Sequence, residues 1–265
     1  MKKLFLIFLL PCVLFARERA VSLSPTVTEL ILSAGGKELI CGRSSACDAP
    51  AVKEIPIAGD FGKPFAEKVL SLKATVIVTD AEHPQGQWEL LKKCGVKIEV
   101  LSGKKLDDLP ENLRRIGKVL NLPQAEKEAQ RVAGKINDLR KNAPEVRKKA
   151  VILFSVAPLI SCGKESFITG ALALAGMDTP AAQNGKSYFY LTPEELFRIN
   201  PEIIFTAGIP EKVVRKHFSG KVFQAVDAVK NKRIVVLDEN KWCRLTPELI
   251  EAVQSMREAQ SRAQH

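Results

Sequence analysis

Residues 64–79, PFAEKVLSLKATVIVT, and residues 191–206, LTPEELFRINPEIIFT, decide the fold because they repeat one pattern. Aligned without gaps, the two stretches place Glu67 on Glu194 and match apolar positions along most of their length. The spacing predicts, in each stretch, a short helix with a glutamate in its first turn, a tight bend and an apolar strand. Two matched helix–strand units favour a chain built as two similar lobes. Chance similarity is the alternative, since apolar spacing of this kind recurs throughout α/β folds.

An aromatic residue stands three residues upstream of each copy of the repeat, Phe61 in the first and Tyr188 in the second. Matched aromatics at matched positions indicate two lobes that face one another across a cleft. Rings from opposite lobes suit a large flat ligand, because they bury its faces while polar groups orient its rim.

Composition and charge narrow the class of protein. The chain has 265 residues, 46% of them hydrophobic, which is enough for one large or two medium domains with a proper core. Its formal net charge is +10, but lysine and arginine are spread along the chain without a concentrated stripe or interleaved aromatic residues. This pattern argues against a nucleic-acid partner. Charge that is dispersed in this way is more typical of a protein whose lysines and arginines keep it soluble.

Residues 1–16 are predicted to be a secretory signal peptide. They combine a positive start, the apolar run 4–15 and a small residue for cleavage, Ala16. The apolar run is shorter than the roughly 20 residues that span a bilayer, so export to the periplasm is favoured over a retained anchor. A lipoprotein anchor at Cys12 is the less favoured alternative, because Pro11 fits a lipoprotein cleavage box poorly.

Five cysteines follow the predicted signal peptide: Cys41, Cys47, Cys94, Cys162 and Cys243. Export permits disulfides, and at least one thiol of this odd set stays free. Cys41 and Cys47 are close enough in sequence to bridge a loop, but the sequence leaves that pairing open. No pair has C-x-x-C spacing, so a structural zinc site is not expected.

Strands alternate with helices along the chain, which predicts an α/β fold with parallel sheets. Residues 123–142 differ, because an apolar stripe at helical spacing runs through Ala125, Ala129, Val132, Ile136 and Leu139. Such a helix spans roughly 30 Å and would form a stiff connector, an ordinary surface helix being the alternative. The expected organisation is an N-terminal lobe at 17–122, a connecting helix at 123–143 and a C-terminal lobe at 144–265.

Catalytic motifs are missing from the sequence, which has no G-x-S-x-G elbow, no H-E-x-x-H and no G-x-G-x-x-G. The loops expected after the strands instead carry stacking and hydrogen-bonding groups, and such loops bind ligands in parallel α/β sheets. The candidate ligand-binding residues are Asp48, Ala49, Phe61, Gly62, His83, Tyr188, Tyr190, Asn240, Lys241, Trp242, Cys243 and Arg244. No catalytic residue and no catalytic cofactor is expected.

The mature chain resembles, end to end, the periplasmic substrate-binding proteins of ABC importers for vitamin B12, iron–siderophores and haem. The resemblance implies two Rossmann-like lobes joined by one long helix, the class III arrangement. The chain looks most like the cobalamin-binding branch of this family. The segments that carry this resemblance are Val21–Pro25, Thr28–Glu29, Asp60–Gly62, Gly163–Ser166 and Asn240–Pro247. In that branch the residues corresponding to Phe61 and Tyr188 line the cleft. The loop at Asp48 and Ala49 and the segment from Asn240 to Arg244 contact the corrin ligand there.

The resemblance also gives the two repeat glutamates a role. In this family one glutamate on each lobe pairs with arginines of the inner-membrane permease, which works with a cytoplasmic ATPase. Glu67 and Glu194 occupy those positions. The alternative is that each merely complements its helix dipole, which is worth about 0.3–1 kcal/mol.

The ligand is a metal chelate in this interpretation, and several residues could reach its metal. His83 is a possible axial ligand of cobalt or iron, although such a histidine is more often a rim residue. Tyr188 or Tyr190 could bind haem iron through a phenolate, which would favour haem uptake. Cys162 and Cys243 fall in loops that face the same cleft, where buried small residues are the simpler interpretation.

Two classes of function follow. The first is a monomeric binding protein that delivers cobalamin, a related corrinoid, or a ferric-siderophore or haem to an importer, with modest lobe closure. The second is an exported enzyme that processes a chelate in the same cleft, which the missing nucleophile–base pair disfavours. A scavenger without a transporter is a third possibility, in which Glu67 and Glu194 would be dispensable.

Overall fold

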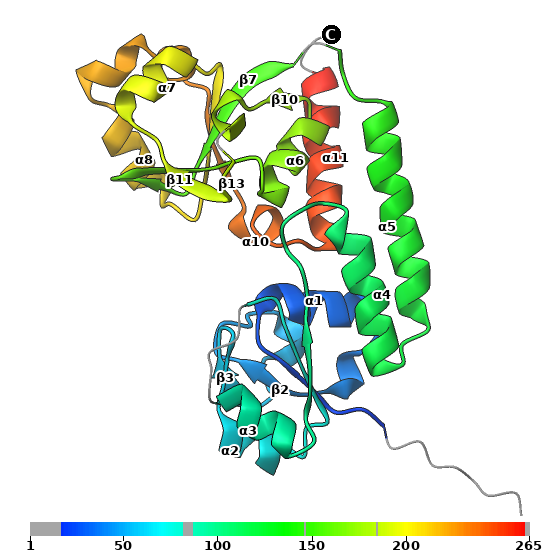
Figure 1. Ribbon diagram of the computed structural model, residues 1–265. Helices are drawn as coiled ribbons and strands as arrows, with labels where there is room; N and C mark the ends of the chain where they lie inside the picture. The colour runs from blue at the N-terminus through cyan, green and yellow to red at the C-terminus, as the bar shows by residue number, and fades with distance from the viewer. Residues whose placement is uncertain (1–16, 82–86, 146, 184, 263–265) are drawn as a thin grey trace, which may run out of the picture.

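The computed structural model describes residues 17–81, 87–145, 147–183 and 185–262, and it places two α/β lobes one above the other (Figure 1). Helix α5 (Gln124–Lys141) runs alongside both lobes on one side of the molecule. It begins directly after Pro123, and its buried face is the apolar stripe of the sequence. In the described ranges, no helix combines the length and the apolar character needed to cross a membrane.

The N-terminal lobe is a six-stranded sheet in the order β4-β3-β2-β1-β5-β6, parallel except for β4. Its strands are β1 (Ala20–Ser22), β2 (Ile40–Ser44), β3 (Ile57–Asp60), β4 (Lys63–Pro64), β5 (Val76–Thr79) and β6 (Lys97–Val100). Its helices and 3₁₀ turns are α1 (Pro25–Ser33), η1 (Lys37–Leu39), η2 (Pro50–Val52), α2 (Ala66–Ser71) and α3 (Gln87–Lys93). Central strand β5 is buried along its whole length, as its apolar sequence VIVT predicts.

The C-terminal lobe has a parallel four-stranded sheet, β10-β7-β12-β13, and an antiparallel three-stranded sheet, β11-β9-β8. The strands are β7 (Lys148–Leu153), β8 (Ser155–Val156), β9 (Leu159–Cys162), β10 (Met177–Asp178), β11 (Tyr188–Tyr190), β12 (Ile203–Ala207) and β13 (Ile234–Leu237). The helices and 3₁₀ turns are α6 (Phe167–Leu174), η3 (Pro180–Gln183), α7 (Pro193–Ile199), α8 (Glu211–Phe218), η4 (Lys221–Ala225), α9 (Asp227–Lys230), α10 (Glu239–Trp242) and α11 (Pro247–Arg262).

The sequence repeat corresponds to two equivalent units of structure. The first copy forms α2 followed by β5, and the second forms α7 followed by β12. α7 begins with a capping box, in which the Thr192 hydroxyl accepts a hydrogen bond from the Glu195 main-chain nitrogen at 3.2 Å. The Glu195 carboxylate accepts a hydrogen bond from the Thr192 main-chain nitrogen at 2.8 Å, whereas the neighbouring Glu194 carboxylate has no hydrogen bond or ion pair among the described residues.

One hydrophobic core runs through both lobes. Helix α4 (Asp108–Leu120) descends beside α1 and packs along α5, which in turn packs against α11. Buried apolar side chains of this cluster come from helices of both lobes and from the helices between them, for example Leu30, Leu113, Val132, Leu172 and Leu249. Because the same core joins the lobes, a wide hinge swing would have to separate packed apolar surface. Modest closure therefore remains our prediction.

The cysteines in the described residues are all free: Cys41, Cys47, Cys94, Cys162 and Cys243. Cys47 lies buried in the N-terminal lobe and accepts a hydrogen bond from the Thr28 hydroxyl at 3.1 Å, while Cys41 stands half-buried on β2. The pairing that the sequence left open is thus not formed here.

Candidate functional site

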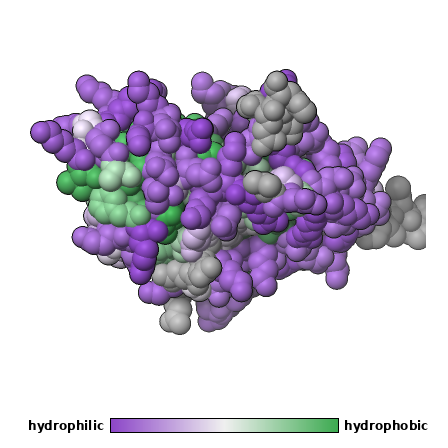
Figure 2. Space-filling model, turned by 90° about the horizontal axis from the view of Figure 1, so that it is seen from above, coloured by the Kyte–Doolittle hydropathy of each residue, from purple (hydrophilic) through white to green (hydrophobic). Residues whose placement is uncertain are grey.

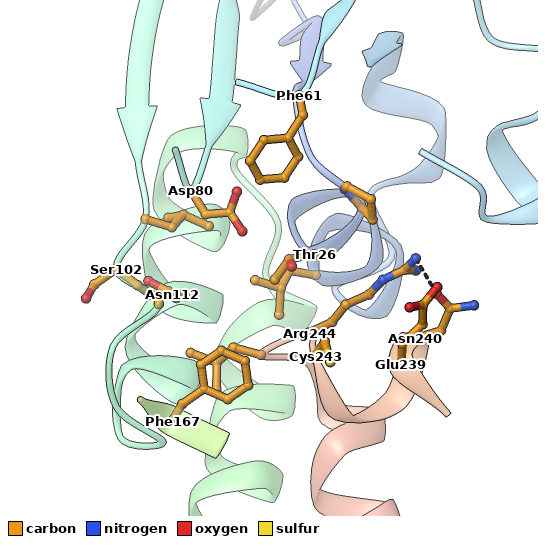
Figure 3. A pocket seen from close by; sticks show the side chains of 15 residues that line it. Thr26, Phe61, Asp80, Ser102, Asn112, Phe167, Glu239, Asn240, Cys243 and Arg244 are labelled. Carbon is orange, nitrogen blue, oxygen red and sulfur yellow. Dashed lines mark hydrogen bonds between the residues drawn. The ribbon is translucent and has the colours of Figure 1, made fainter. Parts of the chain in front are cut away.

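A cavity of about 340 Å³ lies between the two lobes, at the carboxyl ends of the N-terminal strands (Figure 3). The N-terminal lobe and the start of α4 contribute Pro25, Thr26, Leu30, Phe61, Asp80, Leu101, Ser102, Gly103 and Asn112. The C-terminal lobe contributes Phe167, Glu239, Asn240, Cys243, Arg244 and Leu245. The site therefore combines two aromatic rings with a ring of polar groups, as small-molecule sites commonly do.

A helix cap, a strand end and a turn orient three of these side chains toward the cavity. The Ser24 hydroxyl caps α1 by accepting a hydrogen bond from the Val27 main-chain nitrogen at 3.1 Å, which fixes the helix start with Thr26 facing the space. Asp80 directly follows β5, and its carboxylate points inward below Phe61 (Figure 3). Phe61 is 53% exposed at the turn between β3 and β4, so its ring is available to a ligand.

Arg244 forms one wall of the cavity and joins the lobes. Its guanidinium pairs with Glu29 of α1, and its Nη2 atom donates to Asp48 Oδ2 at 2.8 Å and to Asn240 Oδ1 at 2.6 Å. The Arg244 hydrogen bond holds the pKa of Asp48 below its usual range. Burial raises the pKa of Glu29 in spite of the same partner. The arginine is thus already committed to the N-terminal lobe.

A second cavity, of about 520 Å³, is also lined by Arg244. Its lining includes Asp48 and Ala49, and it shares Asn240 and Arg244 with the first cavity. Residues that the sequence places far apart therefore meet at one arginine between the lobes.

The predicted ligand-binding residues fall into three groups. Phe61, Asn240, Cys243 and Arg244 line the first cavity, and Asp48 and Ala49 line the second. Tyr188 and Tyr190 lie on β11, 51% and 72% exposed, and line neither cavity. Tyr188 packs edge-on against Phe154, with ring centroids 5.3 Å apart. β11 lies on the side of the C-terminal lobe that faces the other lobe (Figure 1).

The other four predicted ligand-binding residues are Gly62, Lys241, Trp242 and His83. Gly62 is buried at a turn with φ +63°, and it shapes the turn that carries Phe61. Lys241 is exposed and lines neither cavity. Trp242 differs from the expectation: it is 4% exposed and packs into the core from α10, because its large apolar ring gains more from burial than from a rim position. His83 lies outside the described residues.

Sequence reasoning missed several lining residues, chiefly Thr26, Asp80, Ser102, Asn112, Phe167 and Glu239. Asp80 had a usable signal, because it is the first residue after an apolar strand. Asn112 had no such signal in the sequence, since it lies within the amphipathic helix α4 and resembles an ordinary helix residue.

The thiols and the phenol near the cleft are poor metal ligands as they stand. Burial raises the pKa of Cys243 to about 11 and also raises the pKa values of Cys162 and Tyr188. All three groups are therefore neutral near pH 7. Across the ranges that the structure covers, no group of three or more histidine, cysteine or acidic side chains could hold a metal ion.

Two lobes joined by a continuous helix, with a polar and aromatic cavity between them, define a class III periplasmic binding protein. The model of the periplasmic binding protein family matches residues 21–241, and the chain belongs to this family. The substrate-binding role predicted from the sequence is thereby confirmed.

Curated relatives cover most of the chain. A vitamin B12-binding protein of Pectobacterium carotovorum subsp. carotovorum (strain PC1) is 26% identical over 247 residues, which are 90% of this chain and 87% of that protein. An Fe(3+)-citrate-binding protein, YfmC of Bacillus subtilis, is 27% identical over 190 residues, 70% of this chain and 60% of the relative. Both relatives are named as binding proteins.

Solved structures share the fold. The periplasmic heme binding protein HutB of Vibrio cholerae has a TM-score of 0.82 at 23% identity and covers 92% of this chain and 99% of its own. The periplasmic vitamin B12 binding protein BtuF of the same species has a TM-score of 0.78 at 24% identity, with 93% and 98% covered. The fold is therefore common to proteins named for different ligands.

Proposed function

We propose that this protein captures a corrinoid such as cobalamin between its lobes and delivers it to an inner-membrane ABC permease with its ATPase. The observation that carries the proposal is the inter-lobe cavity, in which Phe61 and Phe167 face each other across polar groups from both lobes (Figure 3). The vitamin B12-binding relative, aligned over 90% of the chain, supports this ligand class. Haem or a ferric chelate is the second candidate, favoured by HutB and YfmC.

The cavity volume bears on how a large ligand is held. About 340 Å³ is at the lower end for small-molecule sites, so the whole of a corrinoid does not fit inside. Part of the ligand would occupy the cavity, and the rest would extend toward the exposed rings of Tyr188 and Tyr190 on β11. The tyrosines and Phe61 would then contact one ligand without lining one closed pocket.

Glu67 and Glu194 are proposed to dock on the permease. Both are exposed, and neither carboxylate has an ion pair or hydrogen bond within the described part of the chain. Their helices, α2 and α7, lie in different lobes, on the side of the molecule away from α5 (Figure 1). An unpaired carboxylate on each lobe is free to meet arginines of a partner.

We also propose that the protein is exported to the periplasm, acts as a monomer and catalyses no reaction. The predicted signal peptide, residues 1–16, lies outside the described residues. A turnover assay on any bound chelate separates a passive carrier from an exported enzyme, since a carrier returns the ligand unchanged.

The decisive experiment is absorption titration of the purified protein with cyanocobalamin, hemin and ferric citrate. The proposal expects saturable spectral change with cyanocobalamin at one ligand per chain. Saturable binding of hemin or ferric citrate alone would move the assignment to the second candidate. Failure of all three to bind would refute the metal-chelate proposal.

A further inference from the structure

The cavity between the lobes offers hydrogen-bond acceptors at its inner side. Asp80 lies there with its carboxylate turned toward Thr26 and its Oδ1 atom buried (Figure 3). That oxygen has no hydrogen-bond partner in the described residues. Burial raises the pKa of the Asp80 carboxyl, although the nearby hydroxyls of Ser24 and Thr26 act in the opposite direction. A buried acceptor without a donor costs free energy until something donates to it.

Asn112 adds a second acceptor beside Asp80. Its side chain is buried on α4, and its Nδ2 atom donates to the Ser102 main-chain oxygen at 2.5 Å. This bond fixes the orientation of the amide and leaves its Oδ1 atom as the group that can accept from a ligand. Asp80 and Asn112 can therefore both accept hydrogen bonds at the inner side of the cavity.

The charges that line the cavity also favour a ligand with hydrogen-bond donors. Only three charged side chains line it in the described structure: Asp80, Glu239 and Arg244. The arginine is already paired with Glu29 and Asp48, so it provides no uncompensated positive charge. No lysine is among the lining residues. A ligand with carboxylates at its rim would meet negative charge here and no free cation.

We propose that Asp80 is a specificity-determining residue, which selects chelates with amide N–H donors at the rim and rejects chelates with carboxylates there. The proposal rests on the proposed function, because it assumes that this cavity holds part of the chelate. A corrinoid carries amide side chains around its ring and meets the requirement. Haem carries propionates and ferric citrate carries carboxylates, and both would be disfavoured.

The geometry favours Asp80 over Glu239 as the selecting group. Glu239 is exposed at the mouth, on α10, where water can solvate its carboxylate in the absence of ligand. Asp80 is half-buried at the inner side of the cavity, so a bound chelate would displace the water that solvates its carboxylate and would have to donate in its place. Glu239→Gln therefore removes the same unit of charge from the lining without altering the carboxylate at the inner side, and it is the matched control.

The test compares wild type, Asp80→Asn and Glu239→Gln in titrations with cyanocobalamin, hemin and ferric citrate. Asp80→Asn should weaken cyanocobalamin binding about tenfold or more. It should also narrow the preference for cyanocobalamin over the two carboxylate-rimmed chelates. Glu239→Gln should weaken cyanocobalamin binding at least about threefold less than Asp80→Asn does, because water solvates the exposed Glu239 carboxylate. Circular dichroism and thermal unfolding verify that each variant is folded.

Three outcomes overturn the inference. If Asp80→Asn and Glu239→Gln weakened cyanocobalamin binding equally, only the net charge of the cavity would affect affinity. Unchanged cyanocobalamin affinity in Asp80→Asn would remove Asp80 from recognition while leaving the proposed function intact. Tighter binding of hemin or ferric citrate than of cyanocobalamin by the wild type would reverse the selectivity. Failure of every chelate to bind the wild type would instead refute the proposed function itself.

Discussion

Arg244 joins the two lobes through Asp48, with 2.8 Å between Arg244 Nη2 and Asp48 Oδ2. The arginine follows α10 in the C-terminal lobe, and the aspartate follows β2 in the N-terminal lobe. Glu29 of α1 pairs with the same guanidinium, whose side chain is 14% exposed. The contact therefore joins the two lobes at a residue that lines both cavities. It acts beside the shared hydrophobic core to set the distance between the lobes.

Arg244→Met should destabilise the protein by about 2 kcal/mol, because it leaves Glu29 and Asp48 without their cation at a partly buried site. Chemical denaturation measures the change in the free energy of unfolding. Arg198→Met is the control, since the Arg198 side chain is 78% exposed and lies 3.9 Å from Glu195. A loss no larger than that of the control would contradict a structural role for the cross-lobe pair.

Reversing both repeat glutamates, Glu67→Arg with Glu194→Arg, should abolish ligand uptake by cells and leave ligand affinity unchanged. The two positions lie outside both cavities, so ligand affinity should not change. The introduced arginines would repel the permease arginines as like charges, so docking should fail. Uptake of labelled ligand and titration of the purified variant are the two measurements. Glu111→Arg with Glu258→Arg, on the α4 and α11 side, is the control and should still support uptake. Normal uptake by the first double variant would remove the docking assignment.

Phe61→Ala should weaken chelate binding by about tenfold, since it removes an aromatic face that lines the cavity. Titration at fixed ionic strength measures the dissociation constant. Phe65→Ala offers a close comparison, because Phe65 is also exposed, at 46%, but lines neither inter-lobe cavity. Similar affinities for the two variants would mean that Phe61 makes no stacking contact.

Asp80→Asn should raise the melting temperature near pH 7 by about 2–4 °C, the shift expected for roughly 1 kcal/mol in a chain of this size. Burial raises the pKa of Asp80 in the folded protein above that in the unfolded chain. Its contribution to stability is therefore greatest below the unfolded pKa and falls as the pH rises through the folded pKa. Asparagine does not titrate, so the variant avoids this loss of stability. The difference in melting temperature between the variant and the wild type should therefore shrink toward zero below about pH 4. An advantage independent of pH would argue against a titrating Asp80.

Gly62→Ala should cost about 1–2 kcal/mol, because φ is +63° and the added Cβ would stand 2.5 Å from the Ala81 Cβ atom. The strain falls on the turn that carries Phe61, so ligand affinity should drop as well. Gly134→Ala is the matched change on α5, where a Cβ meets nothing within 4 Å. It should stabilise the protein by about 0.5–1 kcal/mol, since glycine disfavours a helix interior. Denaturation curves of the two variants should shift in opposite directions.

Much of the architecture was predictable because it depends on periodic burial. The repeat identified α2–β5 and α7–β12 as equivalent units, and the apolar stripe from Ala125 to Leu139 located the buried face of α5. Each of these features is local in sequence, since strand and helix periods follow from neighbours a few residues apart. Phe61 was predictable as well, from its place before the first repeat.

The composition of the cavity depended on contacts that sequence spacing does not encode. Trp242 had the chemistry of a stacking residue but is buried in the core, whereas Asn112 resembled an ordinary helix residue but lines the cavity. The orientation of a helix relative to a neighbouring lobe decides which side chains face the space between them.

By itself, the sequence determined two α/β units and the helix that joins them, because apolar periodicity fixes which face of each element must be buried. Only the tertiary structure decided that Arg244 is paired with Glu29 and Asp48, and that the Oδ1 atom of Asp80 is buried without a hydrogen-bond partner in the described residues. Those residues are up to 215 positions apart, and a pairing between distant side chains is set by how the lobes pack around the shared core.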